Sequence, residues 1–202
     1  DGRFDEAEEE LRSAMAFSGR AHELENDLGV LLAMQGEFDA AQEAFERGLR
    51  SRPDDLPLQI NRALIEADLG RPKVALKRLA AMTEKNPTDF DCLGNLSSLL
   101  LETGRKEDSL EVARRMTAQA PFDPRGYYLS GRALYDLGRY AEAEEALERA
   151  ARLDPFQVDT LIALGLCHAA SGRRRECVQV LERARNLAPN DPDVLYNLGL
   201  AY

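Results

Sequence analysis

The chain has 202 residues, of which 44% are hydrophobic and 31% charged, and its formal net charge at pH 7 is −10. This composition is typical of a folded protein with a well-solvated surface. The acidic balance argues against duplex DNA or an anionic membrane as partner, because phosphate binding needs clustered Lys and Arg. The longest apolar run, LIALGLC at 161–167, is far shorter than the roughly 18 residues of a membrane span. We therefore expect neither nucleic-acid binding nor membrane insertion.

Glycine and proline recur along the chain with a period of 34 residues. The glycines are Gly2, Gly36, Gly70, Gly104, Gly138 and Gly172, and the prolines are Pro53, Pro87, Pro121, Pro155 and Pro189. Small residues stand five positions after these glycines, at Ala7, Ala41, Ala75, Ser109, Ala143 and Cys177. Others stand seven positions before them, at Gly29, Ala63, Ser97, Gly131 and Gly165, with Gly199 continuing the series. A period this regular indicates a structural repeat.

Each column of the repeat has a physical reason. Glycine between two helix-periodic segments supplies the positive φ that a tight turn needs. Proline ends the second segment because it has no N–H to continue a helix, and Asp123-Pro124 supplies a capping carboxylate before the next one. The small residues let two helix backbones approach closely. The pattern predicts two antiparallel helices in each repeat, in registers such as 24–35 and 39–51.

In chain order, we expect residues 1–21 to be the second helix of a truncated repeat and residues 192–202 to be the first helix of another. Between them we predict five complete repeats, at 22–55, 56–89, 90–123, 124–157 and 158–191. The chain opens at Asp1 and both ends interrupt a repeat, so we expect it to be a piece of a longer protein.

A 34-residue helix-turn-helix unit with these columns resembles the tetratricopeptide repeat. The segments GRYAEAEEALERAARLDP (138–155) and YNLGLAY (196–202) are close to the usual pattern of that family. The resemblance covers the whole chain and implies an all-α, right-handed solenoid of antiparallel helix pairs. Local departures stand where the family prefers apolar or large residues, so we expect the middle repeats to pack less tightly than the fifth. They are Arg62, Glu66, Lys106 and Ala113.

No pattern in the sequence predicts a catalytic, metal or cofactor site. Cys167 and His168 are neighbours on a predicted helix and point about 100° apart, so they cannot form a nucleophile–base pair. The cysteines, which include Cys92 and Cys177, lack the spacing of a disulfide framework or a zinc site, and we interpret them as buried thiols. Whether Cys167 or Cys177 has a redox role stays open. We expect the fragment to be no enzyme and to need no cofactor.

In the family that the repeats resemble, the first helix of each repeat lines a concave groove that commonly holds a partner segment. The resemblance places nine partner-binding residues here: Asn61, Leu64, Asn95, Arg125, Tyr128, Arg132, Tyr135, Ile162 and Leu166. Tyr128, Arg132 and Tyr135 share one helix face, and Tyr and Arg are enriched in interface hot spots. The alternative is that Tyr128 or Tyr135 packs against a neighbouring repeat.

Asn61, Asn95 and Asn197 occupy equivalent positions, and amides in a row can hydrogen-bond the backbone of an extended peptide. The row resembles the asparagine ladder of O-GlcNAc transferase repeats, although Leu129 and Ala163 interrupt it. The alternative is that each Asn bonds within its own repeat.

The carboxylate clamp of co-chaperone repeats needs several Lys or Arg residues, and only Arg125 fits at the corresponding positions. Apolar positions such as Ile162 and Leu166 instead favour an amphipathic helix or an apolar extended segment as ligand.

The sequence thus predicts a non-catalytic protein–protein interaction scaffold that binds a peptide or amphipathic helix in its concave groove. Two alternatives stay open: the substrate-recognition arm of a larger enzyme such as an O-GlcNAc-transferase-like glycosyltransferase, and a scaffold that self-associates through exposed solenoid ends. Unpaired cysteines favour the cytoplasm, and a composition rich in Ala, Arg, Leu and Gly leads us to expect a bacterial protein.

Overall fold

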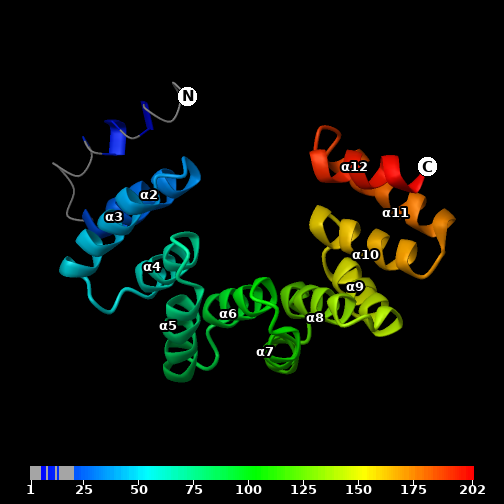
Figure 1. The fold of residues 1–202 in the computed structure, drawn as a ribbon, viewed down its shortest axis with the longest axis horizontal. Helices are drawn as coiled ribbons and strands as arrows, with labels where there is room; N and C mark the ends of the chain where they lie inside the picture. Colours follow the sequence, from blue (N-terminus) through cyan, green and yellow to red (C-terminus); the bar gives the residue numbers. More distant parts are fainter. Residues whose placement is uncertain (1–5, 8, 12, 14–20) are drawn as a thin grey trace. The chain divides into compact units, whose positions relative to one another are not determined.

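The computed structural model describes residues 6–7, 9–11, 13 and 21–202. The predicted helix at 1–21 lies almost wholly outside these described residues. The helices from α2 onward are α2 (Ala21–Met34), α3 (Phe38–Ser51), α4 (Leu56–Asp68), α5 (Pro72–Lys85), α6 (Phe90–Glu102), α7 (Lys106–Gln119), α8 (Pro124–Asp136), α9 (Tyr140–Leu153), α10 (Val158–Ala170), α11 (Arg174–Leu187) and α12 (Pro192–Ala201) (Figure 1).

The chain divides into two compact units, an N-terminal unit of residues 1–85 and a C-terminal unit of residues 86–202. In the N-terminal unit α2 packs against α3, α3 against α4 and α4 against α5, and in the C-terminal unit each helix from α6 to α12 packs against the next. The first helices of consecutive repeats also touch, as α6 with α8 and α8 with α10. This contact pattern confirms the expected fold class, an all-α solenoid of helix pairs.

Glycine forms the turn inside each helix pair. The φ angle is positive at Gly36, Gly70, Gly104, Gly138 and Gly172, between 72° and 81°, a region that side chains with a Cβ avoid. At one such turn the N–H of Gly138 donates to the carbonyl of Tyr135 at 2.9 Å, and the N–H of Arg139 donates to the carbonyl of Leu134 at 2.9 Å. These bonds satisfy the last carbonyls of α8. The turn role predicted for the glycine column is confirmed.

Aspartate caps the N-terminus of most of the first helices. The side chains of Asp55, Asp89, Asp123 and Asp191 each accept a hydrogen bond from a backbone N–H of the first helical turn, at 2.8–3.0 Å. Such caps satisfy donors that a helix leaves unpaired at its N-terminus. At α10 the equivalent residue is Gln157, whose side chain makes no capping bond.

A small residue on the first helix of a pair faces a larger one on the second. A Cβ added to Gly131 would lie 2.4 Å from Cγ of Leu147, and one added to Gly29 would lie 2.4 Å from Cε1 of Phe45. Such contacts are far closer than carbon atoms tolerate. The glycines therefore make room for these side chains and set how closely the two helices approach.

The α6/α7 pair meets the same requirement differently. Ser97 takes the place of glycine, and its counterpart on α7, Ala113, is small and fully buried. The hydroxyl of Ser97 lies 2.9 Å from the hydroxyl of Ser109 and donates to the Ser109 carbonyl at 3.1 Å, and Ser109 Oγ donates to the Ser97 carbonyl at 2.8 Å. This contact between helices is thus hydrogen-bonded.

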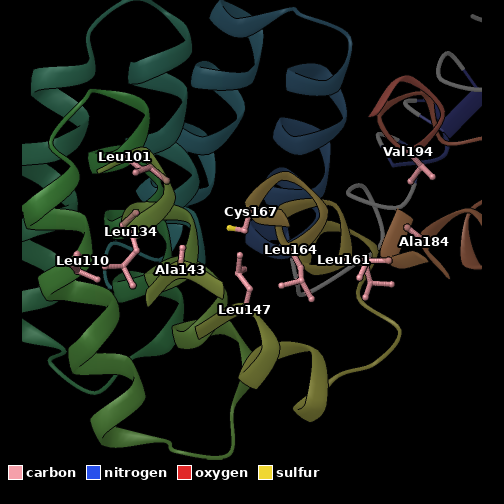
Figure 2. Packing of buried hydrophobic residues seen from close by; sticks show 12 residues of the cluster. Leu101, Leu110, Leu134, Ala143, Leu147, Leu161, Leu164, Cys167, Ala184 and Val194 are labelled. Carbon is pink, nitrogen blue, oxygen red and sulfur yellow. The ribbon is translucent and has the colours of Figure 1, made fainter. Parts of the chain in front are cut away.

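One cluster of buried side chains runs through the C-terminal unit, and a smaller one lies between α11 and α12. Figure 2 shows Leu110 of α7, Leu134 of α8, Leu147 of α9 and Leu164 of α10 following one another through the larger cluster. Because each helix buries its apolar face against its neighbours, the stability of such a fold is close to a sum of repeat and interface terms.

Two polar residues occupy a buried column that holds leucine at positions 32, 100 and 134. Glu66 is 4% exposed, and its carboxylate lies 3.1 Å from Arg71 Nη1 and 3.8 Å from Arg78 Nη2. His168 is 6% exposed, with Nδ1 3.5 Å from Glu144 Oε1. Burial lowers the pKa of His168. Glu144 is held in turn by Arg173 Nη1 at 2.6 Å.

Candidate partner-binding groove

A cavity of about 270 Å³ lies between α6 and α8 of the C-terminal unit. It brings together three of the predicted partner-binding residues, Asn95, Arg125 and Tyr128, with Phe90. Most of its lining comes from the first helices of two consecutive repeats, the helices that the family resemblance assigns to the partner. We call this cavity the α6/α8 groove.

Arg125 bridges the two walls of the α6/α8 groove. Its guanidinium lies 2.8 Å from Asp123 and 3.3 Å from Asp91, and it stacks over the Phe90 ring at 5.0 Å from the centroid. The hydrogen bond from Arg125 lowers the pKa of the Asp123 carboxyl. Because two carboxylates already engage it, Arg125 ties α8 to α6 and is no free cation for a ligand.

Tyr128 and Arg132 form a pair on the face of α8. The guanidinium carbon of Arg132 lies 5.7 Å from the centre of the Tyr128 ring, a cation–π contact. Tyr128 is half-buried and also packs against the core cluster, and burial raises its pKa. One part of the ring thus belongs to the core and the rest stays accessible beside the groove.

Tyr135 has a different environment from Tyr128. Its ring lies 5.4 Å from the ring of Tyr140 on α9, at an interplanar angle of 57°, and it packs against the same core cluster. The ring partner of Tyr135 belongs to its own repeat, and both tyrosines pack against the core cluster, so packing inside the protein accounts for part of each ring.

The three equivalent asparagines are all engaged within the protein. Asn95 and Asn197 donate from Nδ2 to carbonyls of their own helices, those of Asp91 and Asp193, both at 2.8 Å. Asn61 donates to Asn26 Oδ1 of the preceding repeat at 2.8 Å. Bonding inside the repeat therefore holds for two of them, and a backbone ladder would have to break these bonds or use the remaining Oδ1 acceptors.

The remaining predicted residues are divided between the two units. Asn61 and Leu64 lie on α4 of the N-terminal unit, and Ile162 and Leu166 lie on α10 of the C-terminal unit, where Ile162 packs against the core cluster. Leu64, Ile162 and Leu166 are all partly exposed.

Phe90, Met116 and Gln157 line the α6/α8 groove and were missed from the sequence. Phe90 is the first residue of α6 and Gln157 directly precedes α10. Both therefore lie at helix ends, outside the positions that the family resemblance selects.

The cysteines are all free thiols and all buried. Burial raises the pKa of Cys92 and of Cys167 to about 12 and raises that of Cys177 as well. Since the thiolate is the reactive form of cysteine, these side chains are poor nucleophiles near neutral pH.

Within the residues described, no group of His, Cys, Asp and Glu has an arrangement suited to a metal ion. Over the same residues, no helix combines the length and the apolar character of a membrane span.

Paired helices of fixed length, glycine turns and a groove between first helices define a helical-repeat protein. The chain belongs to the tetratricopeptide repeat family, whose profile matches residues 1–61, 66–133 and 134–198. Domains of this family generally serve as non-catalytic scaffolds for protein–protein interaction. No curated protein matches the chain.

Solved structures of the same fold cover nearly all of the chain. A thermophilic TPR protein of Thermus thermophilus is 24% identical with a TM-score of 0.78, covering 89% of this chain and 98% of its own. Yeast Tom70 is 15% identical with a TM-score of 0.83, covering 97% of this chain and 42% of its own. YrrB, described as a TPR protein with an unusual peptide-binding site, is 16% identical with a TM-score of 0.59, covering 92% and 96%.

Proposed function

We propose that this chain is a non-catalytic interaction module that binds a peptide or an amphipathic helix of a partner protein along the α6/α8 groove and the neighbouring face of α10. The observation that carries the proposal is the half-buried Tyr128 with Arg132 over its ring, beside a cavity between two first helices. Partly exposed aromatic and guanidinium groups at a cavity are the usual anchors of protein interfaces.

Charge and polarity around Tyr128 support this assignment. The described residues place no carboxylate within 4.0 Å of the Arg132 guanidinium, whose neighbour is the Tyr128 side chain. Ile162 and Leu166 add a partly exposed aliphatic surface on α10. A partner segment with apolar residues and an acceptor for Arg132 fits this combination.

Affinity capture from a matched lysate would test the proposal, with wild type beside the Tyr128→Ala/Arg132→Ala variant. We expect a partner that the variant loses, with a measured affinity lower by about 2 kcal/mol or more and unchanged helicity. Phe122→Ala/Arg115→Ala is a matched control, because it removes an exposed aromatic ring and an exposed arginine away from the groove. A partner that binds wild type and both variants equally would refute the groove assignment.

Self-association is the second candidate, and the surface of α12 favours it. Large side chains on α12 and directly after it are 47–69% exposed, namely Leu195, Tyr196, Leu200 and Tyr202. Burying such a surface between copies removes apolar area from water. Sedimentation velocity over a range of concentrations would test it. A mass that rises with concentration in wild type but not in Leu200→Asp supports it, and a constant monomer mass refutes it.

A further inference from the structure

A second type of cavity lies beside the second helices of the repeats, with an example in each unit. In the N-terminal unit it lies among α3, α4 and α5 with a volume of about 400 Å³, and in the C-terminal unit it lies among α7, α8 and α9 with a volume of about 380 Å³. Five pairs of lining residues are separated by two repeats: Leu49 and Thr117, Gln59 and Tyr127, Arg62 and Ser130, Arg78 and Ala146, Ala81 and Arg149. The two cavities are therefore the same feature of the repeat, which we call the α3/α5 groove and the α7/α9 groove.

In the α3/α5 groove the protein neutralises its own cations. Arg62 Nη2 lies 3.4 Å from Glu46 Oε1, and Arg78 Nη2 lies 3.8 Å from Glu66 Oε1. Each guanidinium that lines this groove thus has a carboxylate of the same unit beside it.

In the α7/α9 groove both members of one of these ion pairs are replaced. Arg114 stands at the position of Glu46, and Ser130 stands at the position of Arg62. Ser130 is 6% exposed, and its hydroxyl has no hydrogen-bond partner. The described residues place no carboxylate within 4.0 Å of Arg114, although its charge, after that of Arg139, helps to lower the pKa of Glu142 in the same groove. Where the N-terminal unit has a closed ion pair, the C-terminal unit has a cation and a hydroxyl without an acceptor.

Arg149 adds a second unneutralised cation to the α7/α9 groove. Its guanidinium stacks over the Tyr127 ring at 5.8 Å, and no described carboxylate lies within 4.0 Å of it, Glu145 one turn earlier on α9 included. Of the other charges that line this groove, Glu142 and Arg152 are engaged by neighbouring side chains, whereas Glu145 has no ion-pair partner within 4.0 Å among the described residues. Glu142 accepts from Arg139 Nε at 2.7 Å, and Arg152 donates from Nη1 to Glu148 at 3.1 Å.

We propose that the α7/α9 groove binds an acidic side chain of a peptide segment, with its carboxylate between Arg114 and Arg149 and its aliphatic part against Tyr127 and Leu134. Charge-assisted hydrogen bonds from a guanidinium are the strongest that a surface groove offers a carboxylate. This site is separate from the α6/α8 groove, since α8 contributes Tyr127, Ser130 and Leu134 here and Arg125 and Tyr128 there. The protein would then have two binding surfaces on one helix.

Fluorescence anisotropy with a labelled hexaglutamate peptide would test the site directly. We expect saturable binding that weakens as salt is added, and an affinity at least about tenfold lower in Arg114→Gln/Arg149→Gln. The matched control is Arg115→Gln/Arg183→Gln, which removes exposed arginines beside Arg114 and one repeat beyond Arg149. We expect this control to bind within about twofold of wild type, and circular dichroism should show equal helicity in all of them.

Three outcomes of these measurements would overturn the proposal. Two are the absence of saturable hexaglutamate binding to wild type and an equal loss of affinity in both double variants. The third is competition by inorganic phosphate at lower concentration than by glutarate, because the site would then be specific for phosphate. Hexaglutamate binding that survives in Tyr128→Ala/Arg132→Ala supports the proposal and distinguishes the two grooves, so that failure of one proposal leaves the other standing.

Discussion

The helix pairs α6/α7 and α8/α9 fill the same space with different atoms. In α8/α9 the three residues at the contact are Gly131, Ala143 and Leu147, and in α6/α7 their equivalents are Ser97, Ser109 and Ala113. In the α8/α9 contact a glycine, which has no side chain, faces a fully buried leucine. In the α6/α7 contact a serine faces an alanine, and hydrogen bonds join two serines. The comparison teaches that one position of the repeat accepts either an apolar or a hydrogen-bonded contact.

The two contacts should respond differently to substitution. The apolar contact is stabilised by removing a leucine side chain from water, worth about 1.5–3 kcal/mol. A buried hydrogen bond contributes only about 0.5–1.5 kcal/mol net, but a buried group left without its partner costs about 1–3 kcal/mol. The apolar contact should therefore tolerate polarity poorly, and the polar contact should tolerate the loss of the Ser97 hydroxyl only because Ser109 Oγ keeps an acceptor, the Ser97 carbonyl.

Leu147→Ala should have the largest effect on this comparison. It leaves a cavity opposite Gly131, which has no side chain to fill it, so we expect a loss of about 2–5 kcal/mol in the free energy of unfolding. Urea unfolding followed by circular dichroism measures it. Leu187→Ala, at a 40% exposed leucine on α11, is the control. A loss below about 1 kcal/mol for Leu147→Ala would mean that the α8/α9 contact relaxes around the cavity.

Ala143→Leu tests the same contact by overfilling it. Ala143 is fully buried, and its carbonyl oxygen lies 3.2 Å from where a Cβ on Gly131 would be. We expect destabilisation of about 1–3 kcal/mol, measured by thermal unfolding. Ala141→Leu on the exposed side of α9 should stay within about 0.5 kcal/mol of wild type. A neutral result at Ala143 would show that the small-residue column does not set the helix separation.

Ser97→Ala probes the hydrogen-bonded contact of α6/α7. The change removes the Ser97 hydroxyl, while Ser109 Oγ keeps its bond to the Ser97 carbonyl. We expect a loss of about 1 kcal/mol in the free energy of unfolding. Ser98→Ala, on the adjacent and partly exposed residue, should change stability less. If both variants match wild type, the serine pair contributes nothing beyond its volume.

The smallest expected effect is on the pH dependence of stability. It extends the comparison to the column where α8 has Leu134 and α10 has His168. Burial lowers the pKa of His168 in the folded protein, so the unfolded chain takes up that proton first as the pH falls. Stability should therefore decrease as the pH falls below about 6.5, and the decrease should end below the folded pKa. Denaturant unfolding of wild type and His168→Leu across this range measures it. An equal pH dependence in both proteins would contradict the assignment.

The sequence predicts the backbone of this protein well because its strongest signals act locally. Glycine at a positive φ and proline without an N–H fix where helices end, and the registers 24–35 and 39–51 correspond to helices at Ala21–Met34 and Phe38–Ser51. The burial of Glu66 is a different matter. Its arginine partners at 71 and 78 compensate its charge, and a helix pattern alone does not reveal that pairing.

The candidate sites depend on contacts between side chains that are far apart in the sequence. Arg125 fits a cation position of a binding groove, yet its engagement by Asp91 depends on how α6 lies against α8. The unneutralised Arg114 is visible as an anomaly only once Glu46 and Arg62 are known to face each other. The predicted partner-binding residues stay a proposal for the same reason, since what they bind depends on which groups are left unsatisfied.

The complementary sizes at the helix contacts also determine where this gene could be cut and rejoined. A chimera that joins α6 to α9 would place Ser97 against Leu147. Even a bare Cβ at the position of Gly131 would lie 2.4 Å from Cγ of Leu147. The reverse splice would place Gly131 against Ala113 and leave a hole. A junction at a glycine turn separates the two helices of a pair and so divides the matched residues. A junction at a proline turn lies between helix pairs and keeps each matched set of residues together. Duplication and shuffling of such repeats should therefore be tolerated at the prolines, and a domain library built from this chain should be divided there.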